Sequence, residues 1–578
     1  MDIRRTVLWM IFSFSLLLLW NNWQVYSGNP SLFGEWGITQ TTGTAAKPEP
    51  AKLATRQPAN TANTSIPSGL PATPAPAATP GVAAASEPPV DHAQKPASSS
   101  KKIDIRTDVY DLTFDTQGAQ LVKAELTKYK DLEDPTKPMV LLDDSAHSTY
   151  LAQTGVVGAP AGQSYPTHLT PFRLVSTDHV MTGNTLKVVF EAESDGVKVV
   201  KTYTLHKDSY AIDVQNDIYN TGSHVIDPSL YFQLSRDGND PPAATQFFHS
   251  SFTGPVVYSS EDKYQKVKFS EIDKGKASYI KQANNGWIGI VQHYFATAWI
   301  PPQNKTRYNE MLRVANNLYA VRSIESVGKI EPGQHQSVLA HLWVGPQDQK
   351  AMSQLAPGLD VVVDYGFLTI IAKPLFQLMT WIHSYVGNWG WTIVVLTLLI
   401  KLVFYPLSAA GYRSMAKMKL VTPRLQEMKK TFGGDRAKMN QAMMQMYKTE
   451  KINPLGGCLP MIVQVPVFIA LYWVLLGSVE MRGAPWILWI HDLSARDPLF
   501  ILPAIMMATM FLQIKLNPTP PDPMQAKMMM AMPLVFGGMM FFFPAGLVLY
   551  YCFNNAVSIA QQRYIMHRLD KEMAVVHR

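Results

Sequence analysis

The chain has 578 residues, of which 47% are hydrophobic and 16% are charged, and its formal net charge is +7. It is too long for one ordinary domain and short of charge for a soluble protein. Two cysteines, Cys458 and Cys552, are too few for a disulfide scaffold or a cysteine-rich zinc or iron–sulfur site. The basic residues lie beside apolar segments and form no aromatic-interleaved nucleic-acid motif, so we expect a membrane protein without a nucleic-acid substrate.

The first 102 residues contain an apolar segment and a polar, proline-rich stretch. In residues 1–26, Arg4 and Arg5 precede an apolar run, which fits either a cleaved signal peptide or a retained anchor. We favour a transmembrane anchor with a cytoplasmic N-terminus, because no small-x-small cleavage site follows promptly. Residues 39–102 are rich in Ala, Pro, Thr and Ser, so we predict a disordered linker.

Residues 103–347 have the pattern of a β-domain. Short runs alternate between apolar and polar residues, and Lys207-Asp208 between two of them predicts a hairpin. Many strands without intervening helical periods indicate a β-sandwich facing water. The runs that carry this prediction are residues 186–190, 199–205, 210–214 and 338–344.

The remainder of the chain is apolar. Residues 366–387 have apolar side chains at helical spacing and predict an amphipathic helix in the membrane interface. Residues 388–565 predict a core of five transmembrane helices, which with the anchor makes six crossings. Three of these segments are short, at about 24 Å of helix against about 30 Å of hydrocarbon, so they should thin the bilayer. The five apolar segments are residues 388–407, 458–477, 499–514, 528–543 and 545–560.

Residues 408–453 form a basic loop between the first two of these segments. The positive-inside rule makes the loop and both chain termini cytoplasmic and the β-domain periplasmic. Thr422 before Pro423 predicts a helix start and Gly433-Gly434 a stop, so a helical hairpin follows. One face of the second arm, with Met439, Met443 and Met446, can either pack on the first arm or form an adaptable surface for apolar clients.

Lys401 is the most informative single residue, because it is a charge within an apolar segment. Its amine can snorkel to the inner headgroups, or it can face a wet cavity inside the helical bundle. Thr397, Gln464 and Asn554 are polar residues in the same or neighbouring segments and favour the cavity, although each can also serve as an interhelical hydrogen-bonding group. Further polar residues of the last segment are Asn555, Ser558, Gln561 and Gln562.

Signatures of enzymes are not present in the sequence. It contains no Walker A loop, no H-E-x-x-H and no G-x-S-x-G. Histidines of the β-domain, such as His249, His293 and His341, lack metal-ligand spacing. We therefore predict neither an enzyme nor a metal site.

One motif of the apolar part reads Asn453-Pro454-Leu455-Gly456-Gly457-Cys458-Leu459-Pro460, and Gln464, Pro466 and Phe468 follow it. With this motif and the segments at residues 414–418, 488–494, 522–525 and 544–551, the chain resembles the YidC membrane-protein insertases of Gram-negative bacteria, in the YidC/Oxa/Alb family. The resemblance runs from about residue 373 to 568.

The resemblance implies a function and a set of partners. It implies an insertase and chaperone of the bacterial inner membrane that acts on nascent integral membrane proteins, alone or with the Sec translocon, without a cofactor. The ribosome, the signal-recognition-particle receptor and membrane lipids are further implied partners.

The resemblance also implies a fold and a site. A five-helix core would enclose a hydrophilic groove, with a periplasmic β-supersandwich outside. The family's groove usually carries an arginine, and the matching position is Lys401, which keeps the charge but loses bidentate pairing. Thr397 and Tyr551 match other groove positions, and Gln464, Phe468 and Asn554 are expected to line the groove or contact the client.

Two other functions fit parts of the sequence. A secondary transporter could use Lys401 as a coupling site, but it predicts inverted repeats and paired helix interruptions, and neither is evident. An envelope scaffold could bind a partner through residues 103–347.

Overall fold

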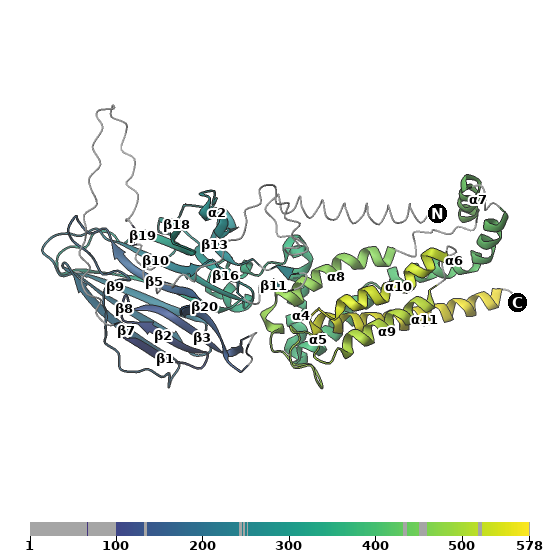
Figure 1. Cartoon of the computed structure of the whole chain (residues 1–578), viewed down its shortest axis with the longest axis horizontal. Coiled ribbons are helices and arrows are strands. Elements are labelled where there is room, and N and C mark those ends of the chain that lie inside the picture. Colours follow the sequence, from purple (N-terminus) through teal and green to yellow (C-terminus); the bar gives the residue numbers. More distant parts are fainter. Residues whose placement is uncertain are drawn as a thin grey trace, which may run out of the picture. The chain divides into compact units, whose positions relative to one another are not determined.

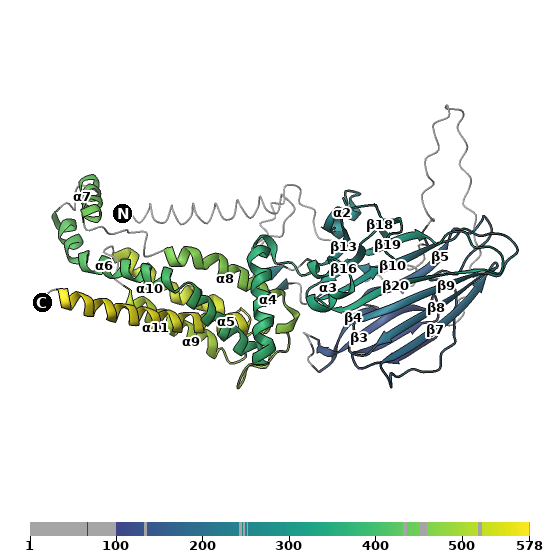
Figure 2. The ribbon, with the colours of Figure 1, turned by 180° about the vertical axis from the view of Figure 1, so that it is seen from behind.

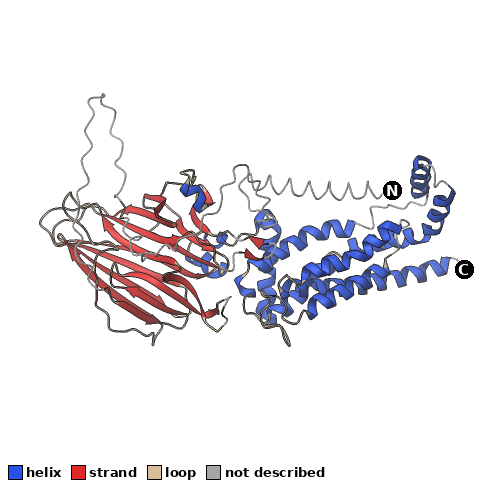
Figure 3. Cartoon of the chain, in the orientation of Figure 1, coloured by secondary structure: helices blue, strands red, loops and turns tan. Residues whose placement is uncertain are grey.

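The computed structural model describes residues 66–67, 100–131, 134, 136–241, 245–246, 249–250, 252–431, 436–449, 459–517 and 523–576. The chain divides into two compact units, Met1–Val362 and Val363–Arg578. Strands make up most of the first unit and helices the second (Figures 1 and 3). The anchor at residues 1–26 and the linker at 39–102 lie outside the described residues, apart from residues 66–67 and 100–102.

The first unit is a sandwich of two antiparallel nine-stranded sheets. In the order in which they pair, the first sheet contains β1 (Lys102–Arg106), β2 (Tyr110–Asp115), β3 (Gln120–Lys130), β4 (Pro138–Asp144), β5 (Thr149–Val157), β10 (Ser229–Asp237), β19 (Leu318–Ser326), β18 (Arg307–Ala315) and β15 (Gln282–Ala283). The second contains β14 (Lys263–Lys266), β13 (Gly254–Ser259), β16 (Trp287–Gln292), β17 (Phe295–Ile300), β20 (His335–Pro346), β9 (Ala211–Asn220), β8 (Val197–His206), β7 (Thr185–Ser194) and β6 (Arg173–Leu174). Smaller elements of this unit are β11 (Thr245–Gln246), β12 (His249–Ser250), α2 (Phe269–Asp273) and α3 (Gln349–Leu355).

Contacts between the two sheets form the core of the sandwich. The rings of Phe232 on β10 and Trp299 on β17 lie 5.3 Å apart. From β8, the Tyr203 hydroxyl donates a hydrogen bond of 2.7 Å to the carbonyl oxygen of Ala119 beside β3. The predicted β-sandwich is therefore confirmed.

The predicted hairpin is confirmed as well. Strands β8 and β9 pair in antiparallel register, with Leu205 opposite Ile212, and Asp208 in the turn has a φ of +54°. The side chains of both strands alternate between buried and half-buried, which is the pattern that the sequence showed.

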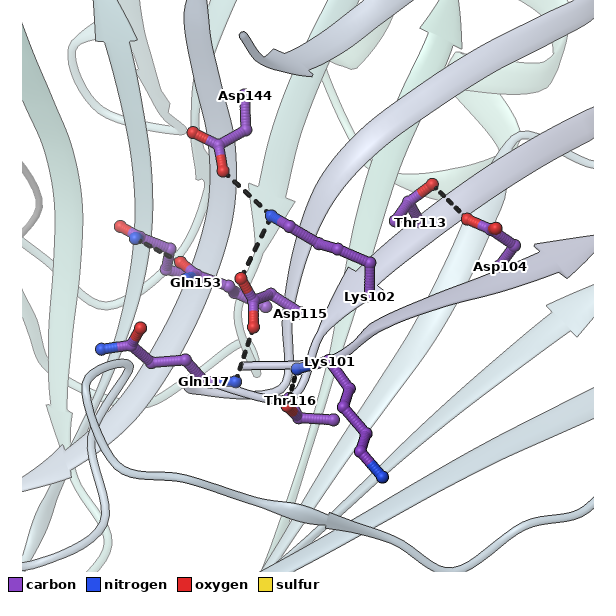
Figure 4. A network of polar contacts seen from close by, with 10 residues as sticks. Lys101, Lys102, Asp104, Thr113, Asp115, Thr116, Gln117, Asp144 and Gln153 are labelled. Carbon is purple, nitrogen blue, oxygen red and sulfur yellow. Dashed lines mark hydrogen bonds and ion pairs between the residues drawn. The ribbon is translucent and has the colours of Figure 1, made fainter. Parts of the chain in front are cut away.

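A polar network ties the first strand to its neighbours (Figure 4). Nζ of Lys102 on β1 lies 3.1 Å from Oδ2 of Asp115 and 3.0 Å from Oδ2 of Asp144. The backbone N–H of Lys101 donates a hydrogen bond of 2.8 Å to Oγ1 of Thr116. These contacts hold Lys101 and Lys102, at the start of the sandwich, against the neighbouring strands.

The second unit contains eight α-helices within its described residues. They are α4 (Thr369–Val386), α5 (Trp389–Val403), α6 (Tyr405–Thr431), α7 (Arg436–Thr449), α8 (Leu459–Gly477), α9 (Ile501–Leu516), α10 (Pro523–Met540) and α11 (Ala545–Val576). Short 3₁₀ turns of this unit lie at Gly366–Leu368 and Val479–Met481, and another at Leu359–Val362 ends the first unit. The predicted helical C-terminal part is confirmed.

Helix α4 occupies the place of the predicted amphipathic helix. It buries Phe376, Met379 and Ile382 and contacts α5 and α8. It ends at Val386, and the next residue, Gly387, has a left-handed φ of +70°. In Figure 2 it runs across the direction of α5, α8 and α11.

The predicted helix start at Pro423 is wrong. Helix α6 begins at Tyr405 and contains Pro423 in its interior. Pro406 occupies the first turn of α6, where the missing N–H of a proline costs no helical hydrogen bond. The helix therefore starts one residue before the earlier proline and continues through the later one.

A bend separates α5 from α6. Among the described residues no single helix is both long and apolar enough to cross a membrane, but α5 and the part of α6 up to Met418 meet that requirement together, as a pair bent by 64°. The six crossings stay a prediction.

Candidate functional site: a buried lysine between α5, α8 and α11

Lys401 lies in the last turn of α5, one residue before Leu402 and close to the bend. The helix starts at Asn388, whose side chain accepts a hydrogen bond from the N–H of Trp391 and so caps the first turn. Lys401 is 7% exposed, whereas Leu402 and Val403, which follow it directly, are 69% and 73% exposed. An ammonium with so little access to water needs polar partners.

Neutral oxygens from two other helices surround the ammonium. Nζ donates hydrogen bonds to Oγ of Ser558 on α11 at 2.8 Å and to Oε1 of Gln464 on α8 at 3.3 Å. Nε2 of Gln464 donates in turn to Oδ1 of Asn554 on α11 at 2.6 Å. Of the predicted site residues, the structure therefore brings Lys401, Gln464 and Asn554 into one hydrogen-bonded cluster, which we call the lysine cluster together with Ser558.

Within the described part of the chain, no carboxylate neutralises the positive charge of the lysine cluster. No ion pair among the described residues involves Lys401, whose ammonium contacts only the neutral oxygens of Ser558 and Gln464 there. The cluster can therefore attract an anionic group from outside the chain.

Thr397 is not a member of the lysine cluster. Its hydroxyl donates to the carbonyl oxygen of Ile393, one turn earlier in α5, at 2.7 Å, and the side chain is 1% exposed. The structure places Thr397 one turn from Lys401, as expected, but gives its hydroxyl a partner within its own helix.

Phe468 and Tyr551 form an aromatic layer one turn away from the lysine cluster. Their ring centroids lie 4.7 Å apart, and Phe536 of α10 meets Tyr551 edge-on at 5.5 Å. Because Phe468 follows Gln464 by four residues and Tyr551 precedes Asn554 by three, this layer lies beside the cluster on the same helices. The structure therefore puts both predicted aromatic residues next to the polar ones.

Two further polar residues of α11 point to a different helix. Nδ2 of Asn555 donates to Oγ1 of Thr509 on α9 at 3.3 Å, and Nε2 of Gln562 donates to Oδ1 of Asn517 at 3.0 Å. Asn555 and Gln562 thus fix α9 against α11 and take no part in the lysine cluster.

The sequence left open whether the three methionines of α7 pack on the first arm or form an adaptable surface for apolar clients. Met443 and Met446 of α7 pack against Val421 and Leu425 of α6, which is the packing alternative. Met439 does not belong to that apolar cluster and is half-buried.

Sequence reasoning did not pair Ser558 and Tyr412 with the lysine. The hydroxyl of Tyr412 on α6 donates to the carbonyl oxygen of Ser558 at 3.4 Å, so α6 also reaches the cluster. The signal for Ser558 was its spacing of four residues from Asn554, which puts both on one face of a helix. Among the residues that the structure describes, no three His, Cys, Asp or Glu side chains are grouped to hold a metal ion.

Comparisons with known proteins identify the class and then the family. Residues 102–378 match the family model of the YidC periplasmic domain, and residues 381–572 match that of the 60Kd inner membrane protein. These matches define an inner-membrane protein with a large periplasmic domain.

Full-length relatives carry the name of an insertase. The chain is 64% identical over 574 residues to the membrane protein insertase YidC of Bordetella pertussis, with 99% of each chain covered, and 51% identical over 578 residues to that of Paraburkholderia xenovorans, with 99% of each covered. The chain belongs to the YidC family of membrane protein insertases. Its members are named for insertion and not for an enzymatic reaction.

Among solved structures, a crystal structure of an active YidC insertase aligns with 80% of this chain and 92% of its own, at 17% identity and a TM-score of 0.39. The family assignment rests on the sequence relatives.

Proposed function

We propose that the chain inserts nascent integral membrane proteins into the bacterial inner membrane and helps them to fold, alone or with the Sec translocon, through a hydrophilic groove at the lysine cluster. The observation that carries the proposal is the ammonium of Lys401, which is 7% exposed and hydrogen-bonded to neutral oxygens of Ser558 and Gln464. Membrane interiors tolerate such a charge where it serves a function.

The proposed topology has six crossings, with both termini in the cytoplasm and the sandwich in the periplasm. The basic hairpin of α6 and α7 supports a cytoplasmic position for the end of α5 that carries Lys401. An interfacial position for α4 is supported by its course across the other helices in Figure 2, since those helices would stand across the bilayer.

The proposed mechanism begins with attraction. A short acidic segment of the client approaches Lys401, and the attraction between the charges is stronger than in water because the surroundings have a low dielectric constant. The apolar part of the client passes Phe468 and Tyr551 and partitions into lipid. The membrane potential favours outward movement of the negative segment by about 2.3 kcal/mol per charge per 100 mV.

Short helices would lower the barrier further. Helix α9 has 16 residues, which corresponds to about 24 Å against a hydrocarbon thickness of about 30 Å. A bilayer that adapts to such a helix becomes thinner around it, so a hydrophilic segment crosses less apolar material.

Recruitment is assigned to the hairpin. Its basic charge and Met439 would meet clients, the ribosome or the signal-recognition-particle receptor, while Met443 and Met446 hold the two arms together. Membrane lipids complete the set of proposed partners.

The test is reconstitution of the purified full-length chain into liposomes with a small two-span client. We expect protease-protected client in liposomes that contain the chain and much less in empty liposomes. Equal protection in both would contradict an insertase function. Deletion of residues 103–347 should leave part of the activity if the helical unit carries it.

A further inference from the structure

The hydrogen bonds around Lys401 have a fixed direction. Oγ of Ser558 donates its single hydrogen to the carbonyl oxygen of Asn554 at 2.7 Å, so the hydroxyl can only accept from the ammonium. Gln464 turns its amide NH₂ group to Oδ1 of Asn554, which leaves its oxygen facing Nζ. Asn554 therefore orients both oxygens that hold the ammonium.

The same face of α11 also holds the backbone of Lys401. Nε2 of Gln561 lies 3.4 Å from the carbonyl oxygen of Lys401, where α5 ends and carbonyl groups lose their partners within the helix. Asn554, Ser558 and Gln561 follow one another at spacings of four and three residues, which is one face of a helix. Helix α11 thus contacts both the ammonium and the backbone carbonyl oxygen of Lys401.

An ammonium has three N–H donors, and the described residues accept from two of them. Within the described residues, Gln464 and Ser558 are the acceptors that contact Nζ. The third N–H is left for a group from outside. A single N–H of a lysine binds one oxygen, whereas an arginine at this position would offer a fork to two.

We propose that Ser558, Gln464 and Asn554 are positioning residues that hold the ammonium of Lys401 at its depth, with one N–H directed to a single carboxylate oxygen of the client's acidic segment. This inference rests on the proposed function. Without these acceptors the flexible lysine stem would carry the charge towards the headgroups, because that is where an unheld amine finds water. The acidic segment would then lose its partner inside the helical unit.

The experiment compares two clients that differ only by Asp or Asn in the segment to be moved. Initial insertion rates are measured with full-length chain in liposomes, and the ratio of the Asp client to the Asn client reports selectivity for negative charge. The variants are Ser558→Ala, Ser558→Thr, which keeps a hydroxyl, and Asn555→Ala, whose side chain bonds to α9 and is similarly buried.

We expect Ser558→Ala to lower the ratio about tenfold or more, the effect of one hydrogen bond to a charged group, with the rate of the Asn client within about twofold of the parent. Ser558→Thr and Asn555→Ala should keep the parental ratio. Equal slowing of both clients by Ser558→Ala would show a merely structural role and overturn the inference, as would an unchanged ratio.

A second variant covers the case in which Ser558→Ala does not fold. Gln464→Met removes the other acceptor while keeping a long side chain, and it should lower the ratio as well; an unchanged ratio overturns the inference. If the parent inserts both clients equally well, the positioning inference is wrong while the insertase function stands. If the parent inserts neither client, the proposed function itself fails.

Discussion

Lys201 offers a quantitative test of the sandwich, because it is a lysine buried between the sheets. Its Nζ donates hydrogen bonds to the carbonyl oxygens of Thr154 and Gly118 at 2.8 and 2.7 Å and lies 4.6 Å from the ring centre of Phe172. Burial lowers the pKa of Lys201 from 10.5 to about 7. The amine is therefore mostly neutral above pH 7 in the folded chain and charged in the unfolded one.

The sign of the pH dependence follows from this difference. Between pH 7 and 10.5 the unfolded chain binds more protons at this site than the folded chain, so the free energy of unfolding rises with pH in that window. The slope is about 1.4 kcal/mol per pH unit. From pH 8 to pH 9.5 the sandwich should gain about 2 kcal/mol, and below pH 7 the contribution is constant.

The assay is urea denaturation of the full-length protein in detergent micelles, followed by tryptophan emission. Trp287, Trp299 and Trp343 are fully buried in the sandwich and report its unfolding. In the variant Lys201→Met the rise between pH 8 and 9.5 should vanish, whereas Lys198→Met, a half-exposed neighbour on β8, should keep it. A parent whose free energy of unfolding is flat over this range would refute the reasoning about Lys201.

Three other predictions concern the site and the sandwich. Lys401→Arg should preserve insertion of clients with acidic segments in the liposome assay, because the positive charge is kept. Lys401→Glu should reduce their insertion rate more than about tenfold, because the sign of the charge is reversed. Equal rates in both variants would contradict the role of the charge. Burial raises the pKa of Glu325 from 4.5 to about 7. Between these pH values the folded chain binds more protons than the unfolded chain, so the free energy of unfolding should fall by about 3 kcal/mol as the pH rises through the window. Glu325→Gln should remove that fall in urea denaturation, and a fall that persists in the variant would assign it to another group. Gly286 has a φ of +90°, and an added Cβ would overlap the carbonyl oxygen of Tyr258, whereas Gly275 has open space around it. Gly286→Ala should therefore lower the free energy of unfolding by about 3 kcal/mol or more, and Gly275→Ala by about 1 kcal/mol. Similar losses in both variants would exclude the overlap as the cause.

Local sequence patterns were sufficient to predict much of the fold. The alternation of residues 199–205 and the turn at Lys207-Asp208 predicted β8, β9 and their hairpin, because side chains of a strand face opposite sides in turn. Lys401 was recognised as the exception in its segment for a similarly local reason, since a charge among apolar residues is costly in a membrane.

The sequence does not show where a helix starts when two positions carry similar start signals. Pro406 and Pro423 are both compatible with a helix start, and only the packing of α6 on α11 and α8 shows that one continuous helix contains them both. The bend at Phe404 was missed for the same reason, because the apolar run continues across it.

Hydrogen bonds between residues distant in the sequence could not be predicted. Lys401 and Ser558 are 157 residues apart, and their hydrogen bond depends on which faces of α5 and α11 meet. The polar face of α11 was visible as a spacing of Asn554, Ser558 and Gln561, but nothing in that spacing separates it from Asn555 and Gln562, which bond to α9 and its end instead.

The central claim is that an acidic segment of the client meets Lys401 during insertion. The most direct measurement is cross-linking with an apolar carbodiimide during insertion, using a client with a single Asp in its moving segment, followed by mass spectrometry of the linked peptides. We expect an amide between that Asp and Lys401, and none at this position with Lys401→Arg, which inserts the client but has no amine. Rapid insertion of the same client with no link to Lys401, or with links only to lysines of the hairpin, would contradict the claim.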